Sequence, residues 1–190
     1  MSTLRNTHFE AVGSYLRPAA LKEARARFAA GEISTETLRE VEDREIADVV
    51  AKQKACGLHY ITDGEFRRSY WHLDFMWGLN GVEHIELDHG YQFHGEETTH
   101  GSLRLTGRIS GENHPFIQDF LYVKQFEEDG VEAKLTIPAP AQFLAELFRG
   151  DNTRNTREYY PNTEELLQDI AAAYRTFFHE VYAAGCRTVQ

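Results

Sequence analysis

The sequence is poor in cysteine, and this shortage excludes one class of protein. Two cysteines occur, Cys56 and Cys186, and neither belongs to a Cys-x-x-Cys pair. Two isolated thiols cannot form the disulfide framework of a small secreted domain, so a reducing cytoplasm is the expected compartment. We expect both thiols to be buried and chemically inert.

The sequence also lacks long apolar runs and an excess of positive charge. No apolar stretch approaches the roughly 20 residues that a membrane-spanning helix needs. The first residues, MSTLRNTHFEAVGSYL, lack the basic segment and apolar run of a signal peptide. Lysine and arginine number 20 against 30 aspartates and glutamates, a formal net charge of −10. We therefore expect no binding to nucleic acid or membrane, while small substrates remain open.

Helices that end in glycine and lead into short apolar strands organise the chain. With 42% hydrophobic and 12% aromatic residues, the 190-residue chain is expected to fold as one domain, residues 1–190. The first expected helix covers residues 19–29, between Pro18 and Gly31. The second is expected to begin after Ser34, with Glu36 in its first turn, and to end at Gly57. The last is expected to begin after Asn162, with Glu165 completing the cap, and to end at Gly185. A short helix is also expected in AQFLAELF, after Pro140.

Four parallel strands are expected from this pattern. They lie near residues 9–13, 58–62, 134–138 and 186–190. The segments KACGLHYIT (54–62) and YAAGCRTVQ (182–190) repeat the order helix, glycine, strand, which is typical of βα units. Alternating residues in YQFHGEETTHGSLRLTGRIS suggest a β-hairpin-like excursion near 84–131.

The predicted fold class is therefore α/β. A (β/α)₈ barrel takes about 250 residues, and this chain would supply its N-terminal half, about the first four βα units. An ordinary four-stranded α/β domain is the alternative. A half-barrel exposes sheet edges that closure would remove, so we expect a complementing half or a homo-oligomer.

Small and acidic residues collect where these strands end. The three motifs are Gly13–Ser14, Asp63–Gly64–Glu65 and Pro138–Ala139–Pro140. A carboxylate there can meet a cationic group of a ligand, and Gly64 lets the backbone turn between the two acids. Ser14 and the neighbouring amides could bind an anionic group. Alternatively, Asp63 and Glu65 form internal ion pairs with Arg67 or Arg68.

Two other clusters each allow two interpretations. The stretch HGEETTH holds His94, Glu96, Glu97 and His100, which could bind a metal. Its polar, turn-rich setting, without an HExxH helix, favours a solvated loop instead. The aromatic side chains of Tyr70, Trp71, Phe75 and Trp77 could stack on a flat ligand or form core beneath a loop.

Three segments together resemble one known family. VGSYLRP (12–18), QKACGLHYITDGEFRR (53–68) and LTIPAP (135–140) resemble the catalytic barrel of cobalamin-independent methionine synthase, especially its shorter single-barrel relatives. Each motif is short, but their order and spacing agree across nearly the whole chain. The resemblance implies a TIM barrel of the methionine-synthase and uroporphyrinogen-decarboxylase type.

The resemblance also implies a substrate site. It assigns Val12, Gly13 and Ser14 to the amino-acid end of homocysteine, and Gly64 and Glu65 to its amino group. The implied reaction moves a methyl group from methyl-tetrahydrofolate to the homocysteine thiol, giving methionine. Zinc would lower the pKa of that thiol, so that the thiolate is the nucleophile. The family's zinc ligands are expected beyond residue 190, and we assign no catalytic residue or metal ligand within the chain.

The chain departs from the family after Glu65. The synthases carry an Arg-Asn-Asp run there, whereas this chain has Arg68, Ser69 and Tyr70. The methyl donor is therefore open. Candidate contacts to the donor or to other charges are Arg17, Asp63, Arg68 and Arg108. The alternatives are a related barrel enzyme with another methyl donor, a decarboxylase, or a half-barrel that binds a small molecule without catalysis.

Overall fold

The structure, a computed structural model, describes residues 9–88, 92–93, 96–97 and 100–190. The described residues divide into two compact units that alternate along the chain. The first, here called the sheet unit, contains the residues up to Arg68, together with Gln118–Thr136 and Cys186–Gln190. The second, here called the ribbon unit, contains Ser69–Ile117 and Ile137–Gly185.

The sheet unit is built on three short parallel strands. They are β1 (Tyr60–Ile61), β6 (Glu132–Leu135) and β7 (Thr188–Val189), in the order β1-β6-β7. Tyr60 pairs with Glu132 and Lys134 pairs with Thr188. The parallel arrangement of the last three expected strands is thus confirmed, although each strand is shorter than expected and β6 begins two residues earlier.

The expected strand at residues 9–13 is wrong, because these residues form no strand in the structure. Side chains, not a neighbouring strand, engage this segment. The Lys134 ammonium donates to the Ala11 carbonyl at 2.6 Å, and the Thr62 hydroxyl donates to the Gly13 carbonyl at 2.8 Å. Carbonyls satisfied in this way need no sheet ladder.

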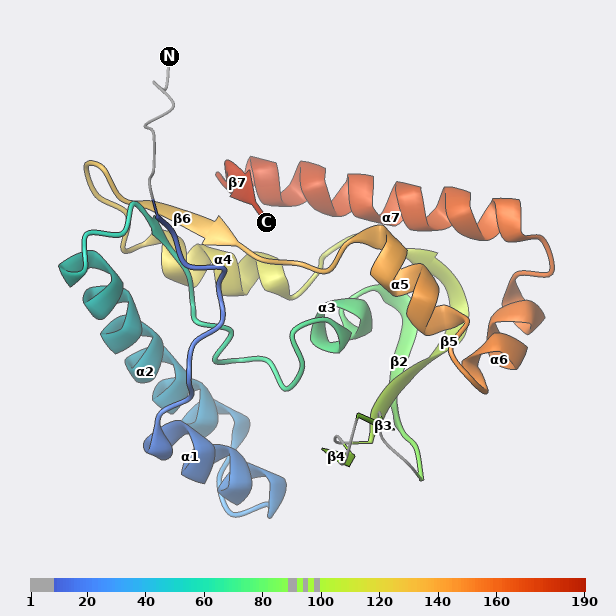
Figure 1. Ribbon diagram of the computed structural model, residues 1–190, viewed down its shortest axis with the longest axis horizontal. Helices are drawn as coiled ribbons and strands as arrows, with labels where there is room; N and C mark the ends of the chain where they lie inside the picture. Colours follow the sequence, from blue (N-terminus) through green and yellow to red (C-terminus); the bar gives the residue numbers. More distant parts are fainter. Residues whose placement is uncertain (1–8, 89–91, 94–95, 98–99) are drawn as a thin grey trace. The chain divides into compact units, whose positions relative to one another are not determined.

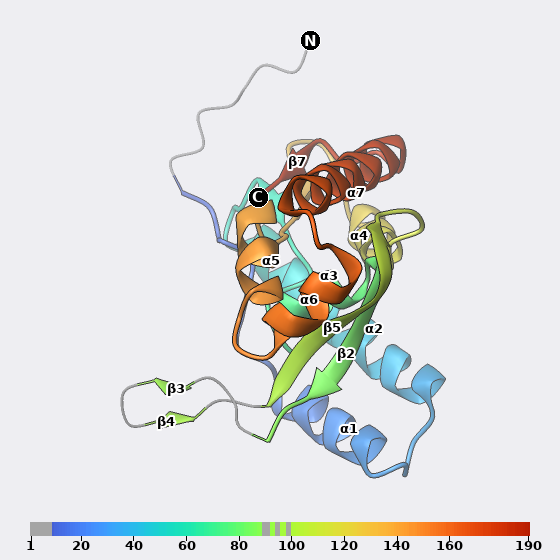
Figure 2. The same ribbon diagram turned by 90° about the vertical axis from the view of Figure 1, so that its right-hand side faces the viewer.

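Two helices of the sheet unit begin where the sequence places them. They are α1 (Ala19–Ala29) and α2 (Thr35–Ala55), which pack against each other (Figures 1 and 2). The Ser34 hydroxyl accepts a hydrogen bond from the Thr37 amide at 3.2 Å, as expected of an N-cap. Near the end of α2, the Gln53 side chain both donates to the Thr62 carbonyl (2.8 Å) and accepts from the Thr62 amide (2.9 Å).

The ribbon unit centres on an antiparallel pair, β2 (Asn80–Glu86) and β5 (Gly101–Ser110). The other elements of this unit are α3 (Leu73–Trp77), α5 (Pro140–Leu147), α6 (Asn152–Tyr159), α7 (Thr163–Ala183) and the short pair β3 (Gln92–Phe93) and β4 (Glu96–Glu97). Helices α5, α6 and α7 all contact β5 (Figure 2). The fully buried side chains of Phe75, Phe143 and Phe177 form part of its core.

Several elements differ from the sequence expectation. The antiparallel ribbon runs from residue 80 to 110, and within the expected excursion near 84–131 lies a helix, α4 (Phe116–Lys124). Helices α3 and α6 were not anticipated either.

Asn162 caps α7, since its carboxamide accepts from the Glu164 amide at 2.9 Å. Glu165 instead pairs with Arg108, so the reciprocal half of the capping box is not made.

None of the described helices combines the length and the apolar composition that crossing a bilayer requires.

The two cysteines differ in exposure, which corrects the expectation that both are buried. Cys186 is 2% exposed, whereas Cys56, at the end of α2, is exposed. Burial raises the pKa of the Cys186 thiol, so its reactive thiolate is scarce near neutral pH.

We expect iodoacetamide to alkylate Cys56 in the folded protein and to leave Cys186 unmodified, as measured by intact mass. A C56S variant should remain unmodified until it is unfolded in urea. Rapid labelling of folded C56S would contradict the burial of Cys186.

Candidate functional site

The candidate site lies in the sheet unit, in the loop that follows β1. Thr62, Asp63, Gly64 and Glu65 are all buried. Gly64 and Glu65 both have left-handed backbones, with φ of 68° and 58°. Glycine adopts this conformation freely, but for Glu65 it costs about 1–2 kcal/mol. A buried acid held in an unfavourable conformation at a strand end is typical of a functional position.

The Glu65 carboxylate is partly satisfied by the protein. The residue is 7% exposed, and its Oε1 accepts a hydrogen bond from the Thr136 hydroxyl at 3.0 Å. An Arg68 guanidinium nitrogen lies 3.4 Å from the same oxygen. Among the described residues, no hydrogen bond reaches the other oxygen, Oε2. A buried carboxylate with one unused oxygen can accept a donor from a ligand.

The two arginines of the loop have different partners. Arg68 is 3% exposed and donates to the Thr136 carbonyl at 2.7 Å, besides pairing with Glu65. The internal ion pair considered from the sequence is therefore present for Glu65 and Arg68. It occupies one carboxylate oxygen, so it does not exclude a ligand at the other.

Guanidinium groups from outside the loop hold its backbone. Arg17 donates to the carbonyls of Glu65 (3.2 Å) and Arg68 (2.6 Å). Arg25, on α1, donates to the Phe66 carbonyl at 2.6 Å. The carboxylate of Asp63 accepts the Glu65 amide at 2.8 Å. Arg17 and Asp63 thus fix the loop that presents Glu65.

Arg67 joins the loop to a cluster of acids. Its guanidinium, 5% exposed, lies 3.0 Å from Glu42, 3.2 Å from Asp119 and also contacts Asp43. Arg39 donates to Asp119 at 2.9 Å. Burial raises the pKa of Glu42 and Asp119, and this effect exceeds the opposite effect of the arginines.

Replacing Arg67 with methionine should lower the free energy of unfolding by about 3–5 kcal/mol at pH 7, because buried carboxylates lose their partner. Their folded-state pKa values, already above the unfolded values, would rise further. The folded state would then bind more protons, so the variant should lose stability as pH rises through these pKa values.

Urea unfolding at pH 5 and pH 7 measures this effect, with Arg39→Met as the control because that guanidinium is 41% exposed. A loss for R67M that is equal at both pH values, or no larger than that of R39M, would contradict the assignment.

The Gly13 turn meets the same residue, Thr136. A Cβ atom on Gly13 would lie 2.5 Å from the Thr136 Cγ2 atom, too close for any real contact. Val12 and Ser14 on either side are exposed. Thr136 therefore touches both the Gly13 turn and Glu65. Sequence reasoning recognised the segment LTIP but gave Thr136 no role, since an isolated threonine carries no signal of its contacts.

A Gly13→Ala change should lower the free energy of unfolding by about 1–3 kcal/mol, because the added methyl group overpacks a buried contact. The same change made in a T136S background should cost clearly less, since Cγ2 is then absent. Urea denaturation of the four proteins of this cycle checks it. Equal losses of unfolding free energy in both backgrounds would show that the Thr136 methyl group does not exclude a side chain at position 13.

Arg108 belongs to the ribbon unit. Its guanidinium lies 2.9 Å from Glu165 and 2.9 Å from Asp169, both on α7, and over the Tyr160 ring at 5.0 Å. The hydrogen bonds that Arg108 donates to these two carboxylates raise its pKa. Among the candidate contacts, Arg108 is thus engaged by surface acids, whereas Arg17, Asp63 and Arg68 gather around Glu65.

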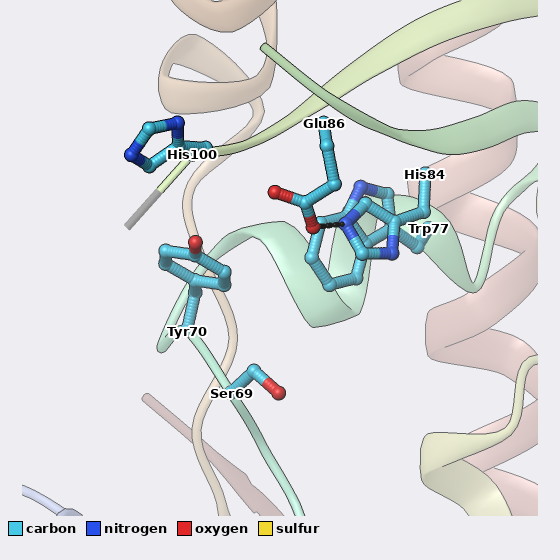
Figure 3. Close-up of a pocket in the computed structure, with 6 residues that line it drawn as sticks. All are labelled: Ser69, Tyr70, Trp77, His84, Glu86 and His100. Atoms are coloured by element: carbon cyan, nitrogen blue, oxygen red, sulfur yellow. Dashed lines mark ion pairs between the residues drawn. The ribbon is translucent and has the colours of Figure 1, made fainter. Parts of the chain in front are cut away.

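A cavity lies within the ribbon unit (Figure 3). It measures about 440 Å³ and is lined by Ser69, Tyr70, Trp77, His84, Glu86 and His100. The His84 ring stacks on Trp77 with centroids 3.8 Å apart and pairs with Glu86 at 2.7 Å (Figure 3). The Tyr70 hydroxyl accepts the Gly101 amide at 2.9 Å. Much of this wall is therefore occupied by internal contacts.

The aromatic cluster divides between core, surface and cavity. Phe75 is core, Trp71 is exposed, and Tyr70 and Trp77 line the cavity. His94 lies outside the described residues, and the His100 ring contacts the Leu87 carbonyl at 2.9 Å. In the described part of the chain, no three His, Cys, Asp or Glu side chains group in a way that could hold a metal ion.

Comparison with known proteins identifies the family. The model of the cobalamin-independent synthase catalytic domain matches residues 7–112, more than half of the chain. The chain therefore belongs to the cobalamin-independent synthase family, as the sequence motifs predicted.

The chain also resembles individual proteins over most of its own length. The chain is 42% identical to the uncharacterised protein YxjH of Bacillus subtilis, over 94% of this chain and 46% of that protein. It is 26% identical to a methionine synthase of Sulfurisphaera tokodaii, over 94% of this chain and 49% of that protein. A putative vitamin-B12-independent methionine synthase structure from Listeria monocytogenes matches with a TM-score of 0.75 and 41% identity, covering 95% of this chain and 50% of that chain. The chain thus spans about half the length of the curated relatives it matches.

Proposed function

We propose that this chain supplies the amino-acid-binding part of a methyltransferase that methylates the thiol of homocysteine, or a similar thiol, to give methionine. The observation that carries the proposal is Glu65. Its carboxylate is buried at a strand end and has one oxygen without a hydrogen bond among the described residues. The chain that carries it belongs to the cobalamin-independent synthase family.

The two ends of an amino acid would meet two different groups. The ammonium would donate to Oε2 of Glu65 in a charge-assisted hydrogen bond. The carboxylate would accept from the backbone amides and the hydroxyl of the Val12–Gly13–Ser14 turn. Thr136 touches both Gly13 and Glu65, which supports the placing of the two groups in one site.

For the fold, we propose a (β/α)₈ barrel in which residues 1–190 form the N-terminal half and a complementing half or a second copy closes the sheet. The sequential order of the parallel strands and the likeness to the Listeria monocytogenes structure support this proposal. The expected compartment is the cytoplasm.

The zinc ion of the family does not fit the described residues, which hold no suitable ligand group. In this proposal the zinc ligands come from residues outside the described ones. Methyl-tetrahydrofolate is the proposed methyl donor. Ser69 and Tyr70, which depart from the family's motif, favour a relative with a different donor as the second candidate.

A Glu65→Gln change should weaken binding of L-methionine at least about tenfold, since the amide keeps the shape but loses the charge that attracts the ammonium. Isothermal titration calorimetry on the polypeptide as its natural gene encodes it measures this change. Glu10→Gln, which alters an exposed acid that pairs with Lys134, is the control. Unchanged affinity in E65Q would refute the role of Glu65.

Intact mass and zinc content of that natural polypeptide test the remaining proposals. A mass about twice that of this chain with about one zinc per polypeptide is expected of a complete thiol-methylating barrel. A mass of this chain alone without zinc would contradict the methyltransferase and leave a binding function.

A further inference from the structure

We propose that Thr136 is a positioning residue: its hydroxyl orients the Glu65 carboxylate so that Oε2 faces the ligand, and it thereby sets selectivity for ligands with a free amino group. This inference rests on the proposed function of the site.

The direction of the hydrogen bond between the two side chains is fixed by chemistry. An ionised carboxylate can only accept, so the Thr136 hydroxyl donates to Oε1 of Glu65, at 3.0 Å. Both residues are buried, with exposures of 8% and 7%. A hydrogen bond sheltered from water has no competing solvent partner, and it fixes the carboxylate group in one rotational orientation.

Thr136 is itself held in place on three sides. Its carbonyl accepts from Arg68 at 2.7 Å, and its methyl group packs against the Gly13 backbone. It directly follows Leu135, the last residue of the central strand β6, whose carbonyl accepts from the Gln190 amide at 2.8 Å. The hydroxyl is therefore presented from a rigid element.

Arg68 explains why the hydroxyl is needed. Its guanidinium reaches the same oxygen, Oε1, only at 3.4 Å. A guanidinium binds a carboxylate best through two parallel hydrogen bonds. Without the hydroxyl, Glu65 is free to turn toward Arg68 and form this two-fold pair, which would engage both oxygens. All charges would remain, yet the oxygen offered to the ligand ammonium would be lost.

The test compares Thr136→Val, which keeps the shape and removes the hydroxyl, with Thr136→Ser, which keeps the hydroxyl. Binding of L-methionine and of its analogue without the amino group, 4-(methylthio)butanoate, is measured by calorimetry on the natural polypeptide. T136V should lose about tenfold or more in affinity for L-methionine, the size of one buried hydrogen bond, and little for the analogue. T136S should retain the wild-type preference.

Two results would overturn the inference. In one, T136V keeps the wild-type preference for L-methionine. In the other, T136V loses affinity for both ligands equally, as a merely structural defect would. Failure of the proposed function looks different, because the unmodified protein would then show no preference for L-methionine over its analogue.

A ligand-free measurement keeps the hydrogen bond testable in that case. T136V, E65A and the double variant form a cycle of unfolding free energies in urea. Coupling between the two changes is expected if the hydroxyl holds the carboxylate. Additive losses would overturn the positioning role regardless of any ligand.

Discussion

The site depends on guanidinium groups that take the place of a sheet ladder. After β1 the backbone turns through two left-handed residues, and its carbonyls leave the register of the strands. Arg17 and Arg25 then bind the carbonyls of Glu65, Phe66 and Arg68. Because each guanidinium offers several donors in a fixed plane, two side chains can hold a loop of irregular backbone. The unfavourable conformation of Glu65 persists because these contacts determine it.

Arg67 and Arg68 are adjacent in the sequence but pair with different acids. Arg67 points to the acids of α2 and α4, where it offsets the burial of negative charge, while Arg68 lies beside Glu65. An ion pair and a ligand site were alternatives when only the sequence was considered. The structure makes them compatible, because a carboxylate has two oxygens and the protein engages one.

Local signals predicted much of the fold, and long-range contacts account for what they missed. Ser34 and Asn162 marked helix starts because their side chains cap the first turn, and the glycines marked helix ends through their backbone freedom. The repeated helix–glycine–strand order predicted the parallel sheet. Residues 9–13 looked like a strand leading into a Gly–Ser turn, but side chains satisfy the carbonyls of Ala11 and Gly13. Helix α3, at five residues, is too short to show a helical period. The motifs suggested Gly13 and Glu65, whereas the contacts of Thr136 come from residues 71 and 123 positions away, which no local pattern records.

The pairing of Gln53 with Thr62 restricts what evolution can place at one position of α2. The Thr62 backbone offers an amide donor and a carbonyl acceptor, and the buried Gln53 carboxamide forms a hydrogen bond with each. Glutamate at this position would supply no donor when ionised, lysine would supply no acceptor, and asparagine is one methylene shorter. Among the natural side chains of this length, only glutamine satisfies both backbone groups. Fewer amino-acid types should therefore be tolerated at position 53 than at the exposed positions of the same helix.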